Sequence, residues 1–372
     1  MSVSGQVNVL FTGGGTGGHL YPGLAIARAL VRERPEVHPF FVGAQRGIER
    51  EILPSSGFPF LLLDLHPLYR PQIWKNWMTV RGALNGWGAL NRLGRSLSPR
   101  LVVGTGGYAA GLTMFWASRR GIPAVQHIGD ATPGITARWS ARFSREAYLG
   151  YPEAANALPR RRGVYRDTGN PIEPPPDIRP AAAAARARWG FPAHAKVLLI
   201  FGGSQGARAI NRAVAAWVEQ GLPRGLCVLW STGRAHHDGF RHLDRPDVRV
   251  LPYIAPIAEA YATADLALVR GGMMGSSELC AWGVPTVIVP LPSAAQDHQT
   301  ANARVLAAAG AAVHLPEGEL RVGALDRVVG GLLADPTRLA TMAAAATARG
   351  RPHAAAEIAA HIGRLLDASI FP

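Results

Sequence analysis

Two short apolar runs, 7–11 and 197–201, each lead into a glycine-rich loop and then into a helical pattern. Short apolar strands that alternate with helices are typical of right-handed β-α-β units built around a parallel sheet. The sequence therefore predicts an α/β fold with two doubly wound, Rossmann-like domains that face each other across a cleft. We expect further strands at 39–42, 101–103, 124–126, 227–230, 266–269 and 286–289, and helices at 22–31 and 207–218.

A proline cluster at 171–176 separates the halves of the chain, since proline-rich stretches act as stiff connectors. We expect an N-terminal domain over 1–172, a C-terminal domain over 173–350, and a final helix over 351–372 that packs back on the N-terminal domain. Residues 1–172 carry 20 Lys and Arg against 9 Asp and Glu, whereas the remainder carries 19 against 16. Most of the excess positive charge therefore belongs to the first domain.

The composition bounds the class of protein. Apolar residues make up 48% and charged residues 17% of the 372 residues, which excludes intrinsic disorder. The only cysteines, Cys227 and Cys280, are too few for a disulfide framework and indicate a reducing compartment. No apolar run reaches the ~18 to 20 residues of a spanning helix, and the N-terminus lacks a signal-peptide pattern. We therefore expect a soluble, cytoplasmic chain.

The first glycine loop, 13–19, contains the G-x-G-x-x-G pattern of dinucleotide-binding folds. Glycines let a phosphate or sugar approach the backbone, and the helix that follows offers free amides. NAD binding also needs an acid after the second strand, and that strand runs instead into Gly43, Ala44, Gln45 and Arg46. NAD is therefore disfavoured, while a tight turn without a ligand stays open.

The loop at 202–206 matches G-x-S-x-G, which is also the nucleophile elbow of hydrolases. A phosphate-binding helix start explains Ser204 and Gln205 equally well without a nucleophile. The loop at 104–108 is either an ordinary turn or a second wall of the cleft. A fourth glycine segment, 270–275, precedes Glu278, which is placed either to accept the two hydroxyls of a ribose or only to face solvent.

Together, the segments 14–22, 104–108, 168–171, 202–211, 270–285 and 299–303 resemble the MurG family of peptidoglycan glycosyltransferases. The resemblance implies a two-domain GT-B fold that transfers N-acetylglucosamine from UDP-GlcNAc to undecaprenyl-linked lipid I, forming lipid II. It implies donor-binding roles for Thr16, Gly17, Gly18, Asp130, Ser204, Gln205, Ile254, Met273, Met274, Gly275, Ser276, Ser277, Glu278 and Gln299. It implies acceptor-binding roles for His19, Tyr108 and His127.

Two positions depart from the family pattern. Asp130 stands where the family has a sugar-binding asparagine, and Glu173 stands where it has an arginine. Both changes are acidic and lie where the family places a diphosphate sugar, so they bear on which sugar the donor carries. The alternatives are another GT-B glycolipid glycosyltransferase, a UDP-sugar epimerase, or a non-catalytic nucleotide-sugar-binding scaffold.

The sequence holds no Asp-x-Asp and no His/Cys cluster with metal spacing, so we expect neither a metal nor another cofactor. Helix N-termini and backbone amides would then stabilise the leaving diphosphate, with inversion at the anomeric carbon. His19 is the candidate base, because its ordinary pKa near ~6.5 suits proton acceptance. A histidine that only binds substrate or caps a helix is the alternative.

A segment with apolar residues at helical spacing carries Trp74, Lys75, Trp77, Arg81 and Trp87. Such spacing marks a core-facing helix more often than a membrane anchor, although tryptophans beside cations suit an anionic lipid surface. A lipid-linked acceptor would place the chain peripherally at the cytoplasmic face of the plasma membrane, near other cell-wall synthesis proteins. Nucleic-acid binding is disfavoured, since no motif for it accompanies the charge.

Overall fold

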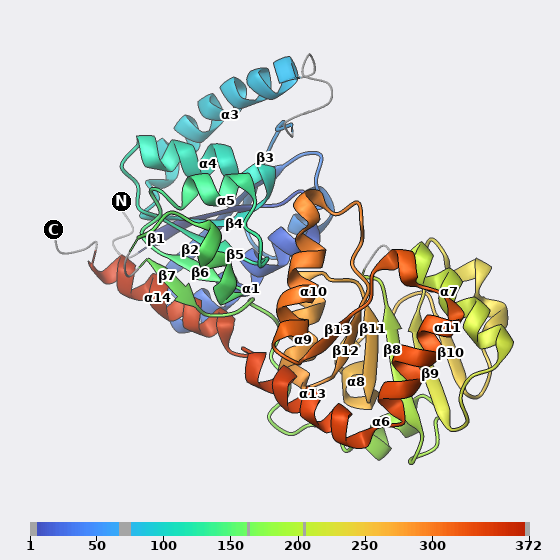
Figure 1. Ribbon diagram of the computed structural model, residues 1–372. Coiled ribbons are helices and arrows are strands. Elements are labelled where there is room, and N and C mark those ends of the chain that lie inside the picture. The colour runs from blue at the N-terminus through green and yellow to red at the C-terminus, as the bar shows by residue number, and fades with distance from the viewer. Residues whose placement is uncertain (1–5, 67–75, 162–163, 204–205, 369–372) are drawn as a thin grey trace. The chain divides into compact units, whose positions relative to one another are not determined.

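The computed structural model describes residues 6–66, 76–161, 164–203 and 206–368 (Figure 1). The chain divides into two compact units, which we describe separately. Unit 1 comprises 1–172 and 353–372, and unit 2 comprises 173–352. Unit 1 therefore contains both ends of the chain, and the division between the units falls within the proline cluster.

Within the described residues, unit 1 contains a parallel sheet of seven strands in the order β3-β2-β1-β4-β5-β6-β7. The strands are β1 (Val7–Gly13), β2 (Val37–Ala44), β3 (Phe60–Leu63), β4 (Leu101–Gly106), β5 (Ala124–Ile128), β6 (Ala147–Leu149) and β7 (Tyr165–Asp167). The helices are α1 (Gly17–Glu33), α2 (Glu49–Ile52), α3 (Asn76–Leu97), α4 (Gly107–Arg119), α5 (Ile135–Ser140) and α14 (Ala354–Ala368).

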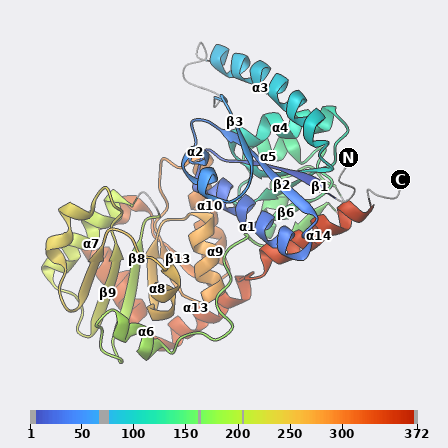
Figure 2. The same ribbon diagram turned by 180° about the vertical axis from the view of Figure 1, so that it is seen from behind.

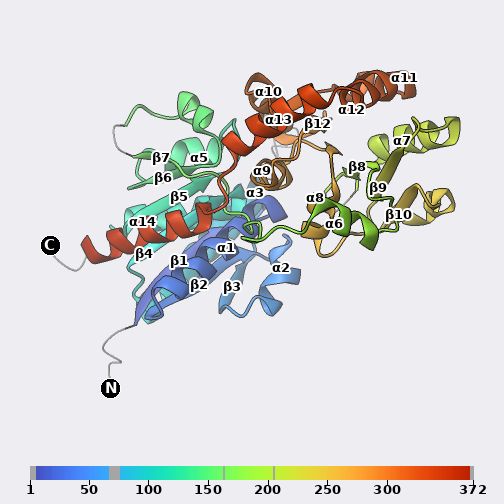
Figure 3. The same ribbon diagram turned by 90° about the horizontal axis from the view of Figure 1, so that it is seen from below.

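The central strands of unit 1 are apolar on both faces because helices cover both sides of the sheet. Val9 and Phe11 pack on one face with α1 and α14, whereas Leu10 packs on the other face with α3 and α4. The final helix α14 lies along α1 (Figures 2 and 3). Arg34, which follows α1, donates a 2.9 Å hydrogen bond to the carbonyl of Gly363 in that helix.

Unit 2 contains, within its described residues, a parallel sheet of six strands in the order β10-β9-β8-β11-β12-β13. The strands are β8 (Lys196–Phe201), β9 (Leu226–Ser231), β10 (Val248–Leu251), β11 (Leu266–Val269), β12 (Thr286–Ile288) and β13 (Ala312–His314). The helices are α6 (Ala182–Arg188), α7 (Arg208–Gln220), α8 (Ile257–Thr263), α9 (Met273–Trp282), α10 (His298–Ala308), α11 (Val322–Leu325), α12 (Gly331–Leu333) and α13 (Pro336–Arg349).

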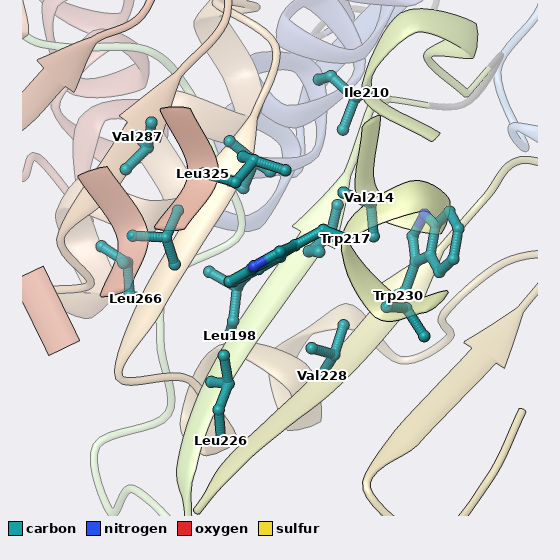
Figure 4. Packing of buried hydrophobic residues seen from close by; sticks show 14 of the residues in the cluster. Leu198, Ile210, Val214, Trp217, Leu226, Val228, Trp230, Leu266, Val287 and Leu325 are labelled. Atoms are coloured by element: carbon teal, nitrogen blue, oxygen red, sulfur yellow. The ribbon is translucent and has the colours of Figure 1, made fainter. Parts of the chain in front are cut away.

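The core of unit 2 forms where α7 packs on the central strands (Figure 4). Val214 and Trp217 of α7 lie over Leu198 of β8 and Val228 of β9, and all four side chains are fully buried. The two parallel sheets confirm the predicted fold class. The sequence prediction was wrong about where the first helix begins, at Gly17 rather than at Pro22, because the glycine loop itself supplies the first turn.

Candidate functional site

Two glycine loops of unit 1 hold each other at the carboxyl ends of β1 and β4, which are neighbours in the sheet. The amide of Gly14 donates to the carbonyl of Gly106 at 3.2 Å. The hydroxyl of Thr105 donates to the carbonyl of His19 at 2.7 Å. His19 lies in the first turn of α1, so these bonds fix the start of that helix against the second loop.

The glycines at this junction make room for the protein's own atoms. A Cβ on Gly106 would lie 2.8 Å from Nδ1 of His19, and a Cβ on Gly107 would lie 2.0 Å from the carbonyl oxygen of Gly14. A Cβ on Gly15 would lie 2.8 Å from the ring of Tyr108. The sequence suggested that a ligand's close approach explains this run of glycines, whereas internal contacts already account for these three.

His127 lies at the end of β5 and is only 2% exposed. The pKa of its imidazole is lowered to about 3, chiefly by burial and to a smaller extent by the charge of nearby His19, while the side chain of Asn170 opposes the shift. His127 is therefore a neutral imidazole at neutral pH. The structure thus brings together three of the residues predicted to bind the acceptor, His19, Tyr108 and His127, in one unit.

In unit 2, the acid Glu278 lies on α9, which follows β11 directly. Its Oε2 accepts a 2.6 Å hydrogen bond from the hydroxyl of Tyr261 on α8. Burial raises the pKa of the Glu278 carboxyl; the Tyr261 hydrogen bond lowers it, and the negative charge of Glu173 raises it again. Glu173, one of the two acidic departures, is thus close enough to Glu278 for its charge to act there.

Gly272, which precedes α9, is the most informative glycine of unit 2. Its φ is −73°, a value that any residue adopts. A Cβ added there would meet no described atom within 4 Å. Neither backbone conformation nor packing against the described residues requires glycine at this position. A ligand that approaches the backbone closely would require it.

Two other predicted donor residues are held by their surroundings. Gln299, in the first turn of α10, accepts a 2.9 Å hydrogen bond from the amide of Leu291, which orients its carboxamide. Ile254 follows β10 and is 3% exposed, so a ligand there would meet its backbone rather than its side chain.

The remaining predicted residues are distributed over both units. Met273, Met274, Gly275, Ser276 and Ser277 form the first half of α9, with Met273 and Ser276 buried. Thr16 precedes α1, Gly17 and Gly18 begin it, and partly buried Asp130 follows β5. Ser204, Gln205, Trp74 and Lys75 lie outside the described residues.

Sequence reasoning missed two side chains, Glu49 and Tyr261. Glu49 is fully buried, and its carboxylate accepts hydrogen bonds from the amides of Gly15 and Ala44. It lies seven residues beyond the strand predicted at 39–42, past the strand end at which NAD-binding folds place their ribose-binding acid. Nothing local marks Tyr261, because only the packing of α8 beside α9 brings it to Glu278.

One face of α3 is exposed and apolar, whereas the other packs on unit 1. Trp77 is 59% exposed, Val80 59% and Leu84 70%, while Leu90 is fully buried. Trp87 continues this face towards exposed Phe115 of α4, with ring centroids 5.8 Å apart. Over the described ranges, none of the helices has both the length and the apolar character needed to cross a bilayer. The same residues hold no cluster of three or more His, Cys, Asp or Glu suited to a metal ion.

Comparison with protein families defines the class. The model of the glycosyltransferase family 28 N-terminal domain matches residues 9–149, and that of the family 28 C-terminal domain matches 197–358. Both halves of a two-domain glycosyltransferase are therefore present, in the same order as the two sheets.

The similar proteins narrow this class. Relatives from Moorella thermoacetica (37% identity, over 94% of this chain and 96% of theirs) and Salinibacter ruber (38%, over 97% of each) are both named UDP-N-acetylglucosamine–N-acetylmuramyl-(pentapeptide) pyrophosphoryl-undecaprenol N-acetylglucosamine transferase. The crystal structure of Acinetobacter baumannii MurG matches with a TM-score of 0.76 at 28% identity, over 96% of this chain and 99% of that one. The chain belongs to the MurG family of glycosyltransferases.

Proposed function

We propose that this protein transfers N-acetylglucosamine from UDP-GlcNAc to the 4-hydroxyl of the N-acetylmuramoyl group in lipid I, which yields lipid II. Relatives with this name align over nearly the whole chain. The single observation that carries the proposal is the paired arrangement of Glu278 with Tyr261 beside the open backbone of Gly272. A carboxylate held in place next to an accessible helix start suits the ribose and diphosphate of a nucleotide sugar.

The donor, in this proposal, binds mainly to unit 2, while Thr16, Gly17, Gly18 and Asp130 of unit 1 keep the donor-binding roles that the family resemblance implies. Glu278 accepts hydrogen bonds from the hydroxyls of the ribose, and the backbone of Ile254 contacts the uracil. Gln299 binds the N-acetylglucosamine. The N-terminus of α9 carries partial positive charge and free amides, which favour a diphosphate. The amides and the partial charge of this helix start stabilise the leaving UDP without a divalent metal.

The acceptor, in this proposal, binds to unit 1 beside His19, Tyr108 and His127. The acceptor hydroxyl attacks C1 of the sugar, a new glycosidic C–O bond forms, and the bond from C1 to the diphosphate oxygen breaks with inversion. His19 takes the hydroxyl proton. His127 suits acceptor binding rather than proton transfer, because a pKa of about 3 makes its imidazole too weak a base.

Measuring UDP release tests this function. Purified protein is mixed with UDP-GlcNAc, UDP-GalNAc or UDP-glucose and a short-chain lipid I analogue, with EDTA present throughout. We expect release only with UDP-GlcNAc plus acceptor, and no loss in EDTA. Release that needs a divalent metal, or that proceeds without acceptor, contradicts the proposal.

The His19 role has a separate test. His19→Gln is expected to lower kcat by about 100-fold or more, the range of general base catalysis. The affinity for UDP-GlcNAc, measured by calorimetry, should stay within twofold, because the contacts proposed for the ribose, the uracil and the sugar belong to unit 2. Wild-type turnover in His19→Gln contradicts the base role.

We propose further that the exposed face of α3 binds an anionic membrane surface, which places the protein peripherally on the cytoplasmic side of the plasma membrane. Trp77 and Leu84 supply apolar area and Arg81 supplies charge. Leu84→Ser should weaken binding to phosphatidylglycerol vesicles by several-fold. Ile178→Ser in unit 2 is the matched control, since Ile178 is 89% exposed and should not matter. Equal vesicle binding by both variants contradicts the assignment.

A further inference from the structure

Glu49 is a fully buried carboxylate in unit 1, and none of the ion pairs formed among the described residues includes it. Removing a charged group from water is costly unless hydrogen bonds compensate for the lost hydration. Glu49 pairs with backbone amides rather than with a cation, so those amides must account for its burial.

Both carboxylate oxygens of Glu49 bind backbone. Oε2 accepts from the amide of Gly15 at 3.0 Å, and Oε1 accepts from the amide of Ala44 at 3.0 Å. Gly15 belongs to the first glycine loop, and Ala44 is the last residue of β2. The side chain therefore ties the loop that follows β1 to the end of the neighbouring strand.

Three glycines leave the space that this carboxylate fills. A Cβ on Gly14 would lie 1.9 Å from Oε1, and a Cβ on Gly47 would lie 1.9 Å from Oε2. A Cβ on Gly43 would lie 2.9 Å from Cγ of Glu49. Gly14 belongs to the first glycine loop, whereas Gly43 lies in β2 and Gly47 follows that strand, so the tertiary structure builds the cradle around one side chain.

The loop is thus held from two directions. Glu49 holds it through Gly15, while the second loop holds it through the Gly14–Gly106 and Thr105–His19 hydrogen bonds. We propose that Glu49 is a positioning residue that sets the place of His19 by holding the Gly15 amide. The same bond occupies that amide, so an anionic ligand of the first loop is bound by later residues and not by Gly15. This inference rests on the proposed function only where it concerns turnover.

Glu49→Gln tests the proposal, because it keeps the shape but replaces one accepting oxygen by an NH2 group that opposes a backbone donor. The matched control is Glu51→Gln, an exposed acid on the same short helix α2. We expect kcat of Glu49→Gln to fall about 10- to 100-fold, the cost of displacing a reacting group by about 1 Å. The KM for UDP-GlcNAc should stay within twofold, and Glu51→Gln should match the wild type.

The pH profile separates positioning from a loss of folded protein. A smaller folded fraction scales kcat equally at every pH, whereas a displaced His19 changes the pH at which kcat falls. We expect the profile of Glu49→Gln to shift. A profile that is only scaled, or a kcat equal to that of the wild type, overturns the proposal.

Amide hydrogen exchange measured by NMR gives a readout independent of activity. The Gly15 amide of the wild type should exchange at least about 100-fold more slowly than in an unstructured peptide, since local opening must break its bond to a buried carboxylate. Unprotected exchange of Gly15 overturns the proposal even if Glu49→Gln does not fold. If no UDP-sugar supports transfer but Gly15 is protected, the proposed function fails while the tethering of the loop stands.

Discussion

The two units share one strand order around their central strands but differ in what surrounds the glycines of their loops. In unit 1, a Cβ on Gly14, Gly15 or Gly107 would lie within 3 Å of other protein atoms. In unit 2, a Cβ on Gly202, Gly206 or Gly271 would likewise lie within 3 Å of other protein atoms, whereas a Cβ on Gly203 or Gly272 would meet no described atom within 4 Å. The loops of both units therefore use glycine for internal packing, and those of unit 2 also contain glycines whose Cβ positions are open.

The acids next to these loops differ in the same sense. Glu49 of unit 1 uses both oxygens on backbone amides and is fully buried. Glu278 of unit 2 is partly buried, and the one hydrogen bond described for its carboxylate comes from Tyr261 to Oε2. A carboxylate saturated by backbone is suited to hold structure, whereas one with a single described partner retains accepting capacity for a ligand.

Matched alanine substitutions should separate the two uses of glycine most clearly. Gly107→Ala is expected to destabilise unit 1 by about 2–4 kcal/mol, because its Cβ would meet a backbone oxygen and its φ of 77° disfavours a side chain. Gly272→Ala should leave stability within about 0.5 kcal/mol but weaken UDP binding about tenfold. Denaturant unfolding and calorimetry measure both effects. Similar destabilisation by the two variants would break the comparison.

Removing the Glu278 carboxylate should weaken only the binding of the donor UDP-GlcNAc. Glu278→Ala is expected to weaken UDP-GlcNAc binding about 100-fold, since each hydrogen bond to a charged group contributes about 1.5–3 kcal/mol. Glu319→Ala, at an exposed acid of the same unit, is the control. Calorimetric titration measures the affinity of both variants for UDP-GlcNAc. An unchanged affinity in Glu278→Ala would contradict the proposal that Glu278 binds the ribose.

Tyr261→Phe should give a smaller effect in the same direction. It removes the hydroxyl that holds Oε2 of Glu278 while keeping the buried ring, a net loss of about 1 kcal/mol. The KM for UDP-GlcNAc should rise about fivefold with little change in kcat. A fall in kcat at constant KM would show that Tyr261 does not act through donor binding.

The smallest expected effect concerns His127 and pH. The folded-state pKa, about 3, lies below the ordinary value of 6.5, so only the unfolded state takes up the proton as the pH falls below 6.5. Folding stability is therefore lost on acidification. His127 should account for a loss of less than about 1 kcal/mol between pH 7 and pH 6. Chemical denaturation at both pH values should show a smaller loss of stability in His127→Gln than in the wild type. An equal loss in the variant and the wild type contradicts the prediction.

Local sequence predicted the main strands because central strands of a parallel sheet are apolar on both faces. It predicted β11 at its observed bounds, and β8 and β9 to within one residue at each end. Strands β3, β6, β7, β10 and β13 were missed, since three or four residues carry little periodic signal, although the equally short β11 and β12 were predicted. Of the site, the loop glycines, His19 and Glu278 are visible in the sequence, whereas Glu49 and Tyr261 are not.

The sequence alone determined the parallel α/β class, the glycine loops at the strand ends and the family resemblance, because these depend on residue types at short spacings. The tertiary structure alone decided what each glycine faces, since a Cβ on Gly14 would meet Glu49 and a Cβ on Gly107 would meet the carbonyl of Gly14. It also decided that Tyr261 meets Glu278, 17 residues away. A glycine only permits close approach, and the packing of distant segments determines which atom approaches.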